Sequence, residues 1–545
     1  MLIWLKYHGS QYGFHPEKSP YEFIDFIGAK ARQFEEKWVE EMAPDAVRVC
    51  ANGYEVRSVA KVRETIDLMQ KRTPILVQPA LWWAPARIYG TPDLLVHTSW
   101  LQDHYPQLVN GSELLASAPA LTLADRPSHY VVFDMKFTSE LDSAHKARDL
   151  ASYAAQVRLY SYMVGRLQGM MPRWAYLVTR DRIFDPIPIE ITSTLDQPLD
   201  RDLAILRNLF VEIKVNGARY VPWRDAIVAV NAAHRDDRWQ SAKRIIAGEK
   251  APGGDPTVVY QISPDIKKEL SRRGFPTLDS LLQADPEDIP FEQCNNLGEA
   301  NSRRIRAILE ANRSGSAVVR CPGAVPPRKE FEFYVDFEYF SNVNVDFDRQ
   351  WPALDGCEMV FMIGLGWEEE GQWTYESFVA SAENHDQERT MLERFIMFLD
   401  KQTDGAFTDG ARASLYHWTP AEAWQADRAS DRHCLADDYL LRHLPWCDLQ
   451  RVFLDGPIGL PGAWTYKLKH VAMALADLDP DFDLWWPGQL DEGLRAMVMG
   501  WKAYQALQPL ESAEMATLGE YLEADCRALW GILRWVRSWV DRTCR

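Results

Sequence analysis

Two charged residues interrupt an otherwise apolar stretch, residues 130–138, in the N-terminal half of the chain. The stretch is rich in β-branched and aromatic residues, which is typical of a buried strand. Asp134 and Lys136 stand two residues apart in it, so on a strand both side chains point to the same face. A buried charge must be paired, bind a metal or take part in chemistry, because leaving it unpaired is costly. The pattern therefore predicts a sheet with a charged site on one face.

A further carboxylate, Asp93, follows a proline and stands where a second apolar strand begins. Pro-Asp, a second strand and then Asp-x-Lys is the order of motifs in the PD-(D/E)xK nucleases, and the chain resembles their RecB-like branch. The resemblance implies a restriction-endonuclease-like α/β domain over residues 1–250. Its catalytic centre would contain Asp93, Asp134 and Lys136. Residues 112–126 lengthen the interval between the motifs and are interpreted as an inserted loop.

Two helical patterns flank these strands. Residues 21–42 form an amphipathic pattern that contains Glu35, which matches the metal-binding acidic residue on the first helix of RecB-like nucleases. A solvated glutamate is the alternative, since other glutamates lie nearby. Residues 144–168 predict a long helix on which Gln156 and Tyr160 share a face. They resemble the family's Q-x-x-x-Y element, which holds the DNA end near the metals, although packing against the sheet would also explain them.

A short helical segment over residues 257–317 follows a linker rich in proline and glycine. Residues 273–281 resemble helix–hairpin–helix modules, which grip DNA phosphates through hairpin amides and helix N-termini. The paired hairpin glycines are missing, and residues 296–299 keep one of them. A structural spacer is the alternative to a DNA-binding module. The arginines that would supply a local basic strip are Arg303, Arg304, Arg306 and Arg313.

The segment over residues 330–545 carries a second set of carboxylates. Asp336 and Glu338 share one face of a strand-like run. Near the end of the chain, Tyr521 and Asp525 lie one helical turn apart. The D-x-E motif at the start of this segment and the Y-x-x-x-D motif near its end resemble the motifs of the DEDD exonucleases, in the form of that family that carries a tyrosine. This resemblance implies an RNase H-like α/β domain.

The family's third acidic motif would fall at residues 415–422. Trp418 stands there in place of the usual asparagine, and Glu422 in place of the usual aspartate. The resemblance implies that Glu422 joins the other carboxylates of this segment around a metal, while Tyr521 positions the water. Residues 466–469, Tyr-Lys-Leu-Lys, also resemble a turn of this family and are interpreted as structural.

Both resemblances imply Mg²⁺ or Mn²⁺ as the cofactor. In the first site, carboxylates at Asp93 and Asp134, with Glu35, would hold the ions through oxygen ligands. Lys136 would orient the attacking water and stabilise the developing charge. A structural ion pair between Asp134 and Lys136, without any metal, is the alternative.

Composition narrows the choice of cofactors and partners. The eight cysteines contain no C-x-x-C pair, which argues against zinc and against a disulfide framework. Only Cys50 precedes the nuclease motif and the next is Cys294, so we expect no iron–sulfur cluster of the kind that some RecB-like nucleases carry. The net charge of −18 argues against a broadly basic surface that coats nucleic acid.

The sequence contains no membrane-length apolar run and no G-x-x-x-x-G-K-[ST] loop, so we expect a cytoplasmic protein without membrane contact or an ATP motor. Together these features predict a metal-dependent nuclease that cleaves DNA, with RNA as the less favoured substrate, in repair, recombination or defence. The competing hypothesis is a nucleic-acid-binding adaptor that has lost activity and recruits a separate helicase. Metal-dependent cleavage of an oligonucleotide would distinguish them.

Overall fold

The structure is a computed structural model with two units of mixed α/β architecture. It describes residues 1–16, 22–86, 88–109, 118–119, 128–192, 199–220, 231–232, 239–433, 441–482 and 493–543. The small unit consists of Ile24–Glu212 and Asn342–Gly356, and the large unit consists of Met1–Phe23, Ile213–Ser341 and Cys357–Arg545. This division differs from the three consecutive segments that the sequence predicts, 1–250, 257–317 and 330–545, because the chain passes between the units more than once.

The small unit contains a six-stranded sheet in the order β1-β2-β5-β6-β7-β8. The central strand β6 is antiparallel to β5 and parallel to β7. The strands are β1 (Val47–Arg48), β2 (Ile75–Val77), β5 (Leu94–His97), β6 (Tyr130–Lys136), β7 (Trp174–Thr179) and β8 (Ile187–Glu190).

The strands around Asp93 form two separate antiparallel pairs. β2 pairs with β5, while β3 (Leu81–Trp83) pairs with β4 (Ile88–Gly90) in a separate two-stranded sheet. The chain turns at Gln78, which has a φ of 50°, and Pro92 has no N–H to donate to a ladder. Most of residues 112–126, interpreted as an inserted loop, lies outside the described residues.

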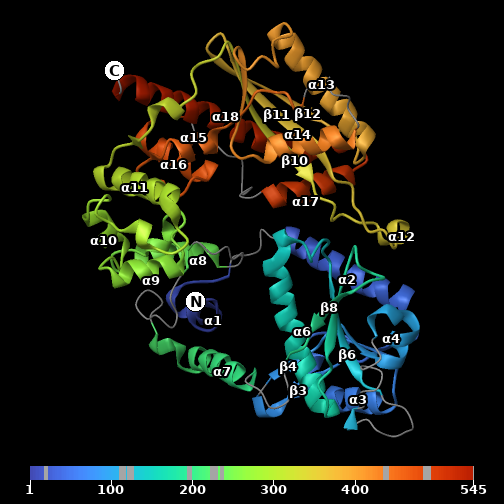
Figure 1. Cartoon of the computed structure of the whole chain (residues 1–545). Coiled ribbons are helices and arrows are strands. Elements are labelled where there is room, and N and C mark those ends of the chain that lie inside the picture. Colours follow the sequence, from blue (N-terminus) through green and yellow to red (C-terminus); the bar gives the residue numbers. More distant parts are fainter. Residues whose placement is uncertain are drawn as a thin grey trace. The chain divides into compact units, whose positions relative to one another are not determined.

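Helices cover both faces of this sheet (Figure 1). On β6, Val131 and Phe133 belong to one apolar cluster with Phe34 of α2, whereas Tyr130 and Val132 belong to another with residues of α6. The predicted alternation along β6 is therefore confirmed. The covering helices are α2 (Glu22–Met42) and α4 (Thr98–His104) on one face, and α3 (Val59–Gln70) and α6 (Ala147–Gln168) on the other.

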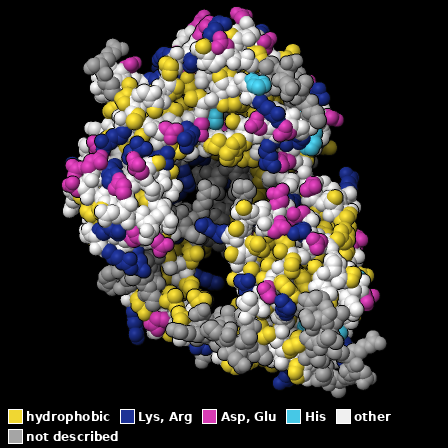
Figure 2. Space-filling view, viewed as in Figure 1, with side chains coloured by type: hydrophobic (Ala, Val, Ile, Leu, Met, Phe, Trp, Pro, Cys, Tyr) yellow, Lys and Arg dark blue, Asp and Glu magenta, His cyan; other side chains and the backbone are white. Residues whose placement is uncertain are grey.

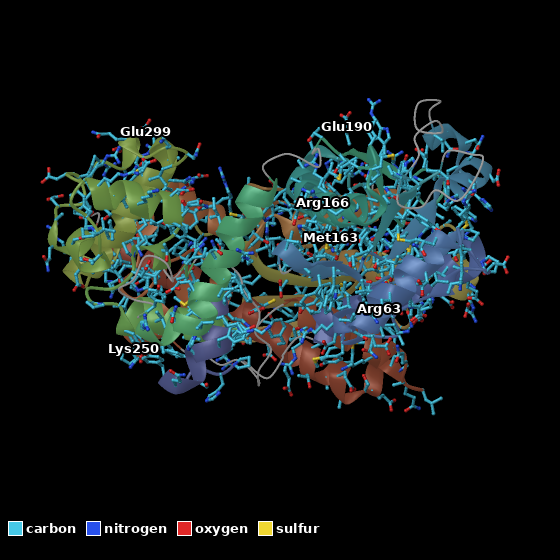
Figure 3. The ribbon with its side chains drawn as sticks, turned by 90° about the horizontal axis from the view of Figure 1, so that it is seen from below. Arg63, Met163, Arg166, Glu190, Lys250 and Glu299 are labelled. Carbon is cyan, nitrogen blue, oxygen red and sulfur yellow. The ribbon has the colours of Figure 1, made fainter. Side chains whose placement is uncertain are left out.

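α6 carries both core and charged side chains, of which Met163 and Arg166 are labelled in Figure 3. Met163 is fully buried against the sheet, in the cluster that contains Tyr130. Arg166 stacks its guanidinium 5.0 Å from the ring centroid of Trp83 on β3. The helix therefore joins the main sheet to the small β3–β4 sheet.

The large unit contains a five-stranded sheet in the order β12-β11-β10-β13-β14. Its central strand β10 is antiparallel to β11 and parallel to β13. The strands are β10 (Phe331–Phe340), β11 (Met359–Glu369), β12 (Gln372–Val379), β13 (Ala413–His417) and β14 (Trp446–Asp448). A separate pair joins β9 (Val318–Val319) to β15 (Ile458–Gly459).

The long helix α18 (Ala513–Thr543) packs closely on this sheet. At Gly364 of β11, an added Cβ would lie 3.0 Å from Leu522 of α18, so the glycine permits this approach. On the opposite face, Phe337 of β10 contacts Phe395 of α13. Other helices of the unit are α13 (His385–Thr403), α14 (Ala421–Arg432), α15 (Leu449–Asp455), α16 (Leu468–Leu478) and α17 (Gly493–Tyr504).

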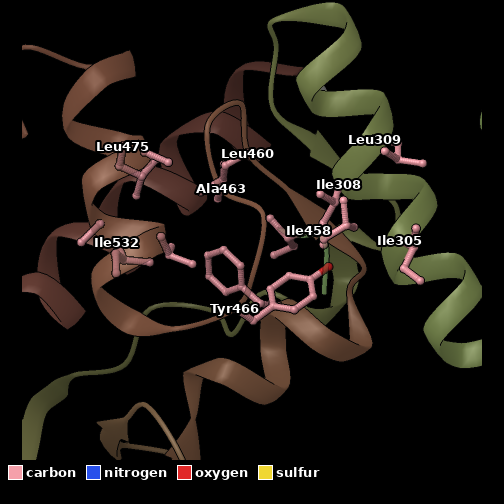
Figure 4. Close-up of a cluster of buried hydrophobic side chains, with 14 of the residues drawn as sticks. Ile305, Ile308, Leu309, Ile458, Leu460, Ala463, Tyr466, Leu475 and Ile532 are labelled. Atoms are coloured by element: carbon pink, nitrogen blue, oxygen red, sulfur yellow. The ribbon is translucent and has the colours of Figure 1, made fainter. Parts of the chain in front are cut away.

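The middle helices share the apolar core of the large unit (Figure 4). Ile305 and Ile308 of α11 lie in one cluster with Ile458, Tyr466 and Ile532, which come from the C-terminal part of the chain. The middle helices are α9 (Pro264–Arg272), α10 (Leu278–Gln283) and α11 (Gly298–Ser314), and the remaining ones are α1 (Leu2–His8), α7 (Leu199–Asn216), α8 (Gln240–Ile245) and α12 (Phe347–Gln350).

Arg306 does not belong to an exposed basic strip, contrary to the expectation from sequence. Its side chain is buried, donates to the carbonyl of Ile289 at 3.0 Å and forms an ion pair with Glu292. Arg304 likewise donates to the carbonyl of Leu454. Arg306 therefore holds the helical segment together, whereas Arg304 links α11 to α15, and Arg303 remains exposed. Among the described helices, none is long and apolar enough to cross a membrane.

Candidate active sites

The first candidate site is built on the central strand of the small unit. β6 ends at Lys136, whose Nζ lies 2.5 Å from Oδ2 of the buried Asp134. Asp93 stands directly before β5, and its Oδ2 accepts a 2.6 Å hydrogen bond from the backbone N–H of Met135. Because β5 and β6 are neighbours, Pro-Asp and Asp-x-Lys meet at one end of the sheet.

Glu35 joins this group from α2. Its pKa is raised to about 7, first by burial and then by the nearby charge of Asp134, against the opposing effect of Lys136. Burial likewise raises the pKa of Asp93, with Asp134 and Glu35 adding to the effect. Burial is the largest single effect on the pKa of Lys136 and lowers it, but the charge of Asp134, the hydrogen bond to Asp134 and the charge of Asp93 together outweigh burial, so the net shift is upward. Three carboxylates and one ammonium group thus interact in one partly desolvated site.

The α6 residues that the sequence singled out lie beside this group. Gln156 donates to the hydroxyl oxygen of Tyr160 at 3.1 Å. Burial raises the pKa of Tyr160, and the charges of Asp134 and Asp93 raise it as well. Direct contacts in the first site join Asp134 to Lys136, Gln156 to Tyr160, and Asp93 to the backbone of β6, while charge interactions connect Glu35 with Asp134 and Lys136.

Two contacts of this site were not predicted from the sequence. Gln78 donates to Asp93 Oδ1 at 3.0 Å, so both oxygens of Asp93 accept hydrogen bonds. The ammonium of Lys136 lies 5.0 Å from the ring centroid of Tyr153 on α6. The positive φ at Gln78 is a backbone feature that sequence alone does not reveal. Tyr153 stands one turn before Gln156 and could have been found from helical spacing.

The second candidate site lies on the central strand of the large unit. Burial raises the pKa of Asp336 well above its usual value, with further contributions from Asp525, Glu422 and Glu338. Burial also raises the pKa of Glu338, again followed by the charges of Asp525 and Glu422. The structure thus gathers the four predicted carboxylates from β10, α14 and α18.

Glu422 is held at the start of α14 by neighbours that the sequence did not single out. Its Oε2 lies 3.2 Å from Nδ1 of the buried His417, which ends β13. His417 Nδ1 also contacts the carbonyl of Thr419. Trp418, which replaces the expected asparagine, instead donates to the carbonyl of Tyr466 at 3.0 Å and fills the core. Trp418 therefore has a packing role.

Tyr521 and Asp525 face this site from α18. Burial raises the pKa of Tyr521, and the charges of Asp525 and Glu338 add to the increase. Lys469, at the start of α16, places its Nζ 4.9 Å from the centroid of the Tyr521 ring. Its charge also lowers the pKa of Glu338 against the dominant effect of burial. Lys469 belongs to the Tyr-Lys-Leu-Lys turn interpreted as structural, and it adds a cation to the second site.

Carboxylate oxygens are the ligands that Mg²⁺ prefers, so both sites contain suitable donors. In the first site, Asp134 Oδ2 contacts Lys136 but has no well-aligned hydrogen bond within the described residues. A cation would also relieve the repulsion among like charges that raises several of these pKa values. Across the described part of the chain, however, no three His, Cys, Asp or Glu side chains are arranged closely enough to hold a metal ion.

Comparison with family models, with curated proteins and with solved structures finds no match to this chain. The interpretation of both sites therefore depends on their own residues. The expectation that no iron–sulfur cluster is present concerns all eight cysteines of the chain. Two of them, Cys434 and Cys544, lie outside the described residues.

Glu35→Gln should stabilise the metal-free protein more strongly at high pH than at low pH. Because the pKa of Glu35 is raised to about 7, the folded chain retains a proton between pH 4.5 and 7 that the unfolded chain releases. The free energy of unfolding therefore falls as pH rises through this window. In EDTA, we expect melting temperatures close to wild type at about pH 5 and a few degrees higher at about pH 8.

Glu40→Gln provides the matched control, because the side chain of Glu40 is 72% exposed on the same helix. Its effect on the melting temperature should be the same at both pH values. A Glu35→Gln effect that does not change with pH would contradict the raised pKa.

Proposed function

We propose that the protein is a metal-dependent nuclease that hydrolyses phosphodiester bonds in DNA, with RNA as the alternative substrate. The observation that carries the proposal is the first site, where acidic side chains from α2, from β6 and from the residue before β5 interact with Lys136, and Gln156 is hydrogen-bonded to Tyr160. These are the side chains, in the same order along the chain, that the resemblance to RecB-like PD-(D/E)xK nucleases implies.

Each residue of the first site has a chemical role in this proposal. Glu35, Asp93 and Asp134 supply carboxylate oxygens for Mg²⁺ or Mn²⁺, which would lower the pKa of a bound water and neutralise the scissile phosphate. Lys136 donates hydrogen bonds to the attacking water and to the developing negative charge. Gln156 and Tyr160, already hydrogen-bonded to each other, orient the nucleic-acid end.

The second site supports a related activity in an RNase H-like domain of the DEDD type. The D-x-E strand β10 is followed by an antiparallel partner, β11, as the resemblance implies. Asp336, Glu338, Glu422 and Asp525 would hold the metal ions, while Tyr521 orients water. Lys469 adds a positive charge that can contact a phosphate beside Tyr521.

A nucleic-acid partner would contact local basic surfaces. Figure 2 shows basic and acidic side chains interspersed over the described parts of the face in view, without a broad basic surface there. In the helical segment, Asn296, with φ of 65°, lies just before α11, and Gly298, with φ of 72°, begins this helix, which also carries the exposed Arg303. Asn296 adopts the conformation that a hairpin glycine would supply. A membrane has no part in this proposal.

One observation favours the adaptor hypothesis. Asp134 and Lys136 form a close ion pair, which is also what a structural pair would do. In that case, the protein would bind nucleic acid and recruit a helicase without cleaving. Cleavage of labelled single- and double-stranded DNA and RNA with Mg²⁺ or Mn²⁺ separates the two functions.

Asp134→Ala and Lys136→Ala should each reduce cleavage by the first site by about 10²-fold or more, because each removes a group that stabilises the transition state. The second site is disabled in these chains by Asp525→Asn, so that cleavage reports the first site. Loss of a labelled oligonucleotide is measured over time, and circular dichroism verifies folding. Glu190→Gln is the control, since Glu190 is an exposed carboxylate on the same sheet. Full activity in both alanine variants would contradict the assignment.

Asp336→Asn should remove Mn²⁺ binding from the large unit. The carboxylates repel each other when ionised, and a cation relieves this repulsion. Isothermal titration calorimetry of the full-length Asp134→Ala chain, whose first site is disabled, should detect residual Mn²⁺ binding that disappears when Asp336→Asn is added. Glu376→Gln, an exposed carboxylate on β12, should leave the binding unchanged. Residual binding that survives Asp336→Asn would argue against the second metal site.

A further inference from the structure

A segment of the C-terminal half of the sequence forms part of the small unit. Residues 342–356 connect β10 to β11, which both belong to the large-unit sheet, yet the segment itself packs within the small unit. It contains the short helix α12, which lies beside α2 (Figure 1). We call residues 342–356 the strap.

Arg180 anchors the strap through polar contacts. Its guanidinium donates to the carbonyl of Asn342 at 2.6 Å, to the Asn342 side-chain oxygen at 2.9 Å and to the carbonyl of Leu354 at 3.4 Å. Arg180 is only 5% exposed, so these acceptors satisfy a buried charge. Its backbone N–H also donates to the carbonyl of Thr138, directly after β6. One buried arginine therefore joins both ends of the strap to the chain that leaves β6.

Apolar contacts fix the middle of the strap. Val345, Phe347 and Leu354 are buried in the same cluster as Phe34 of α2. The Phe347 ring lies 5.8 Å from that of Phe137, which in turn lies 6.0 Å from that of Phe34. Three aromatic rings thus connect the strap, the end of β6 and α2.

The aromatic contacts adjoin the residues assigned to the first site. Phe34 precedes Glu35 on α2, and Phe137 follows Lys136 at the end of β6. The strap also contacts α2 directly, because Lys30 Nζ donates to the carbonyl of Val345 at 2.6 Å and Lys37 pairs with Asp348. The strap therefore touches both elements that carry Glu35 and Lys136.

We propose that the strap is a positioning element for the first site: it fixes α2 against the end of β6, so that Glu35 and Lys136 face the same substrate. This inference rests on the proposed nuclease function. The strap residues do not touch the reacting atoms and act through Phe34 and Phe137. Displacing α2 by about 1 Å would be enough to reduce catalysis by up to about 10²-fold.

The test compares full-length chains that all carry Asp525→Asn, so that cleavage reports the first site alone. Phe347→Ala removes the ring that contacts Phe137, and Asn342→Ala removes one acceptor of Arg180 without changing the backbone acceptors. We expect kcat to fall about 10- to 100-fold with little change in KM, at a temperature where circular dichroism shows both variants folded. Phe347→Leu should restore most of the activity, because it refills the apolar site.

Arg349→Ala is the matched control, since the Arg349 side chain lies on the strap but is 87% exposed. It should leave kcat unchanged. Hydrogen exchange provides a readout that does not require activity: Phe347→Ala should accelerate exchange in residues 30–41 and 133–139 relative to the control. If the Asn342→Ala and Phe347→Ala chains are folded and keep the parent kcat, the positioning role is refuted.

A parent Asp525→Asn chain that does not cleave any oligonucleotide with Mg²⁺ or Mn²⁺ would instead refute the proposed nuclease function of the first site. In that case, hydrogen exchange still decides whether the strap fixes α2 and the end of β6. Unchanged exchange in Phe347→Ala would overturn that structural part of the inference.

Discussion

Placing several carboxylates close together in a buried environment costs free energy, and this cost constrains both candidate sites. Burial is the largest cause of the raised pKa values of Glu35, Asp93, Asp336 and Glu338, and neighbouring acidic groups add to it. Such an arrangement opposes folding unless protons, lysines or cations compensate for it. In each unit, the site is built on the central strand of the sheet. Burial of the apolar side chains around that strand offsets the cost of burying the carboxylates.

Local sequence patterns predicted the elements that carry the sites. The apolar run before Lys136 defined β6, and period-two alternation correctly separated the faces of Val132 and Phe133. Helical spacing likewise paired Gln156 with Tyr160, which are hydrogen-bonded in the structure. These predictions succeed because the information lies within one strand or one helical turn. What the gathered residues catalyse is a separate question, which the sequence addressed only through resemblance.

Contacts between distant parts of the chain could not be predicted in the same way. Arg306 looks like an exposed cation in a basic helix, but the loop residues that bury it come from a different part of the segment. Lys469 reaches Tyr521 across a long stretch of sequence. The strap did leave a local signal, since Val345 and Phe347 are apolar residues within a polar loop. Such residues indicate that something covers them, but they do not identify the partner.

The strap also determines the order in which the protein can be completed during synthesis. The small unit needs residues 342–356, yet its main segment ends at Glu212. The ribosome must therefore add the 144 residues from 213 to 356 before the last part of that unit exists, which takes roughly 7–30 s. By then β10 and the helices of the middle segment have already been made. During synthesis, Glu35 and Lys136 are therefore present long before Phe347. Until residues 342–356 have been added, the α2 side of the first sheet lacks part of its apolar cluster.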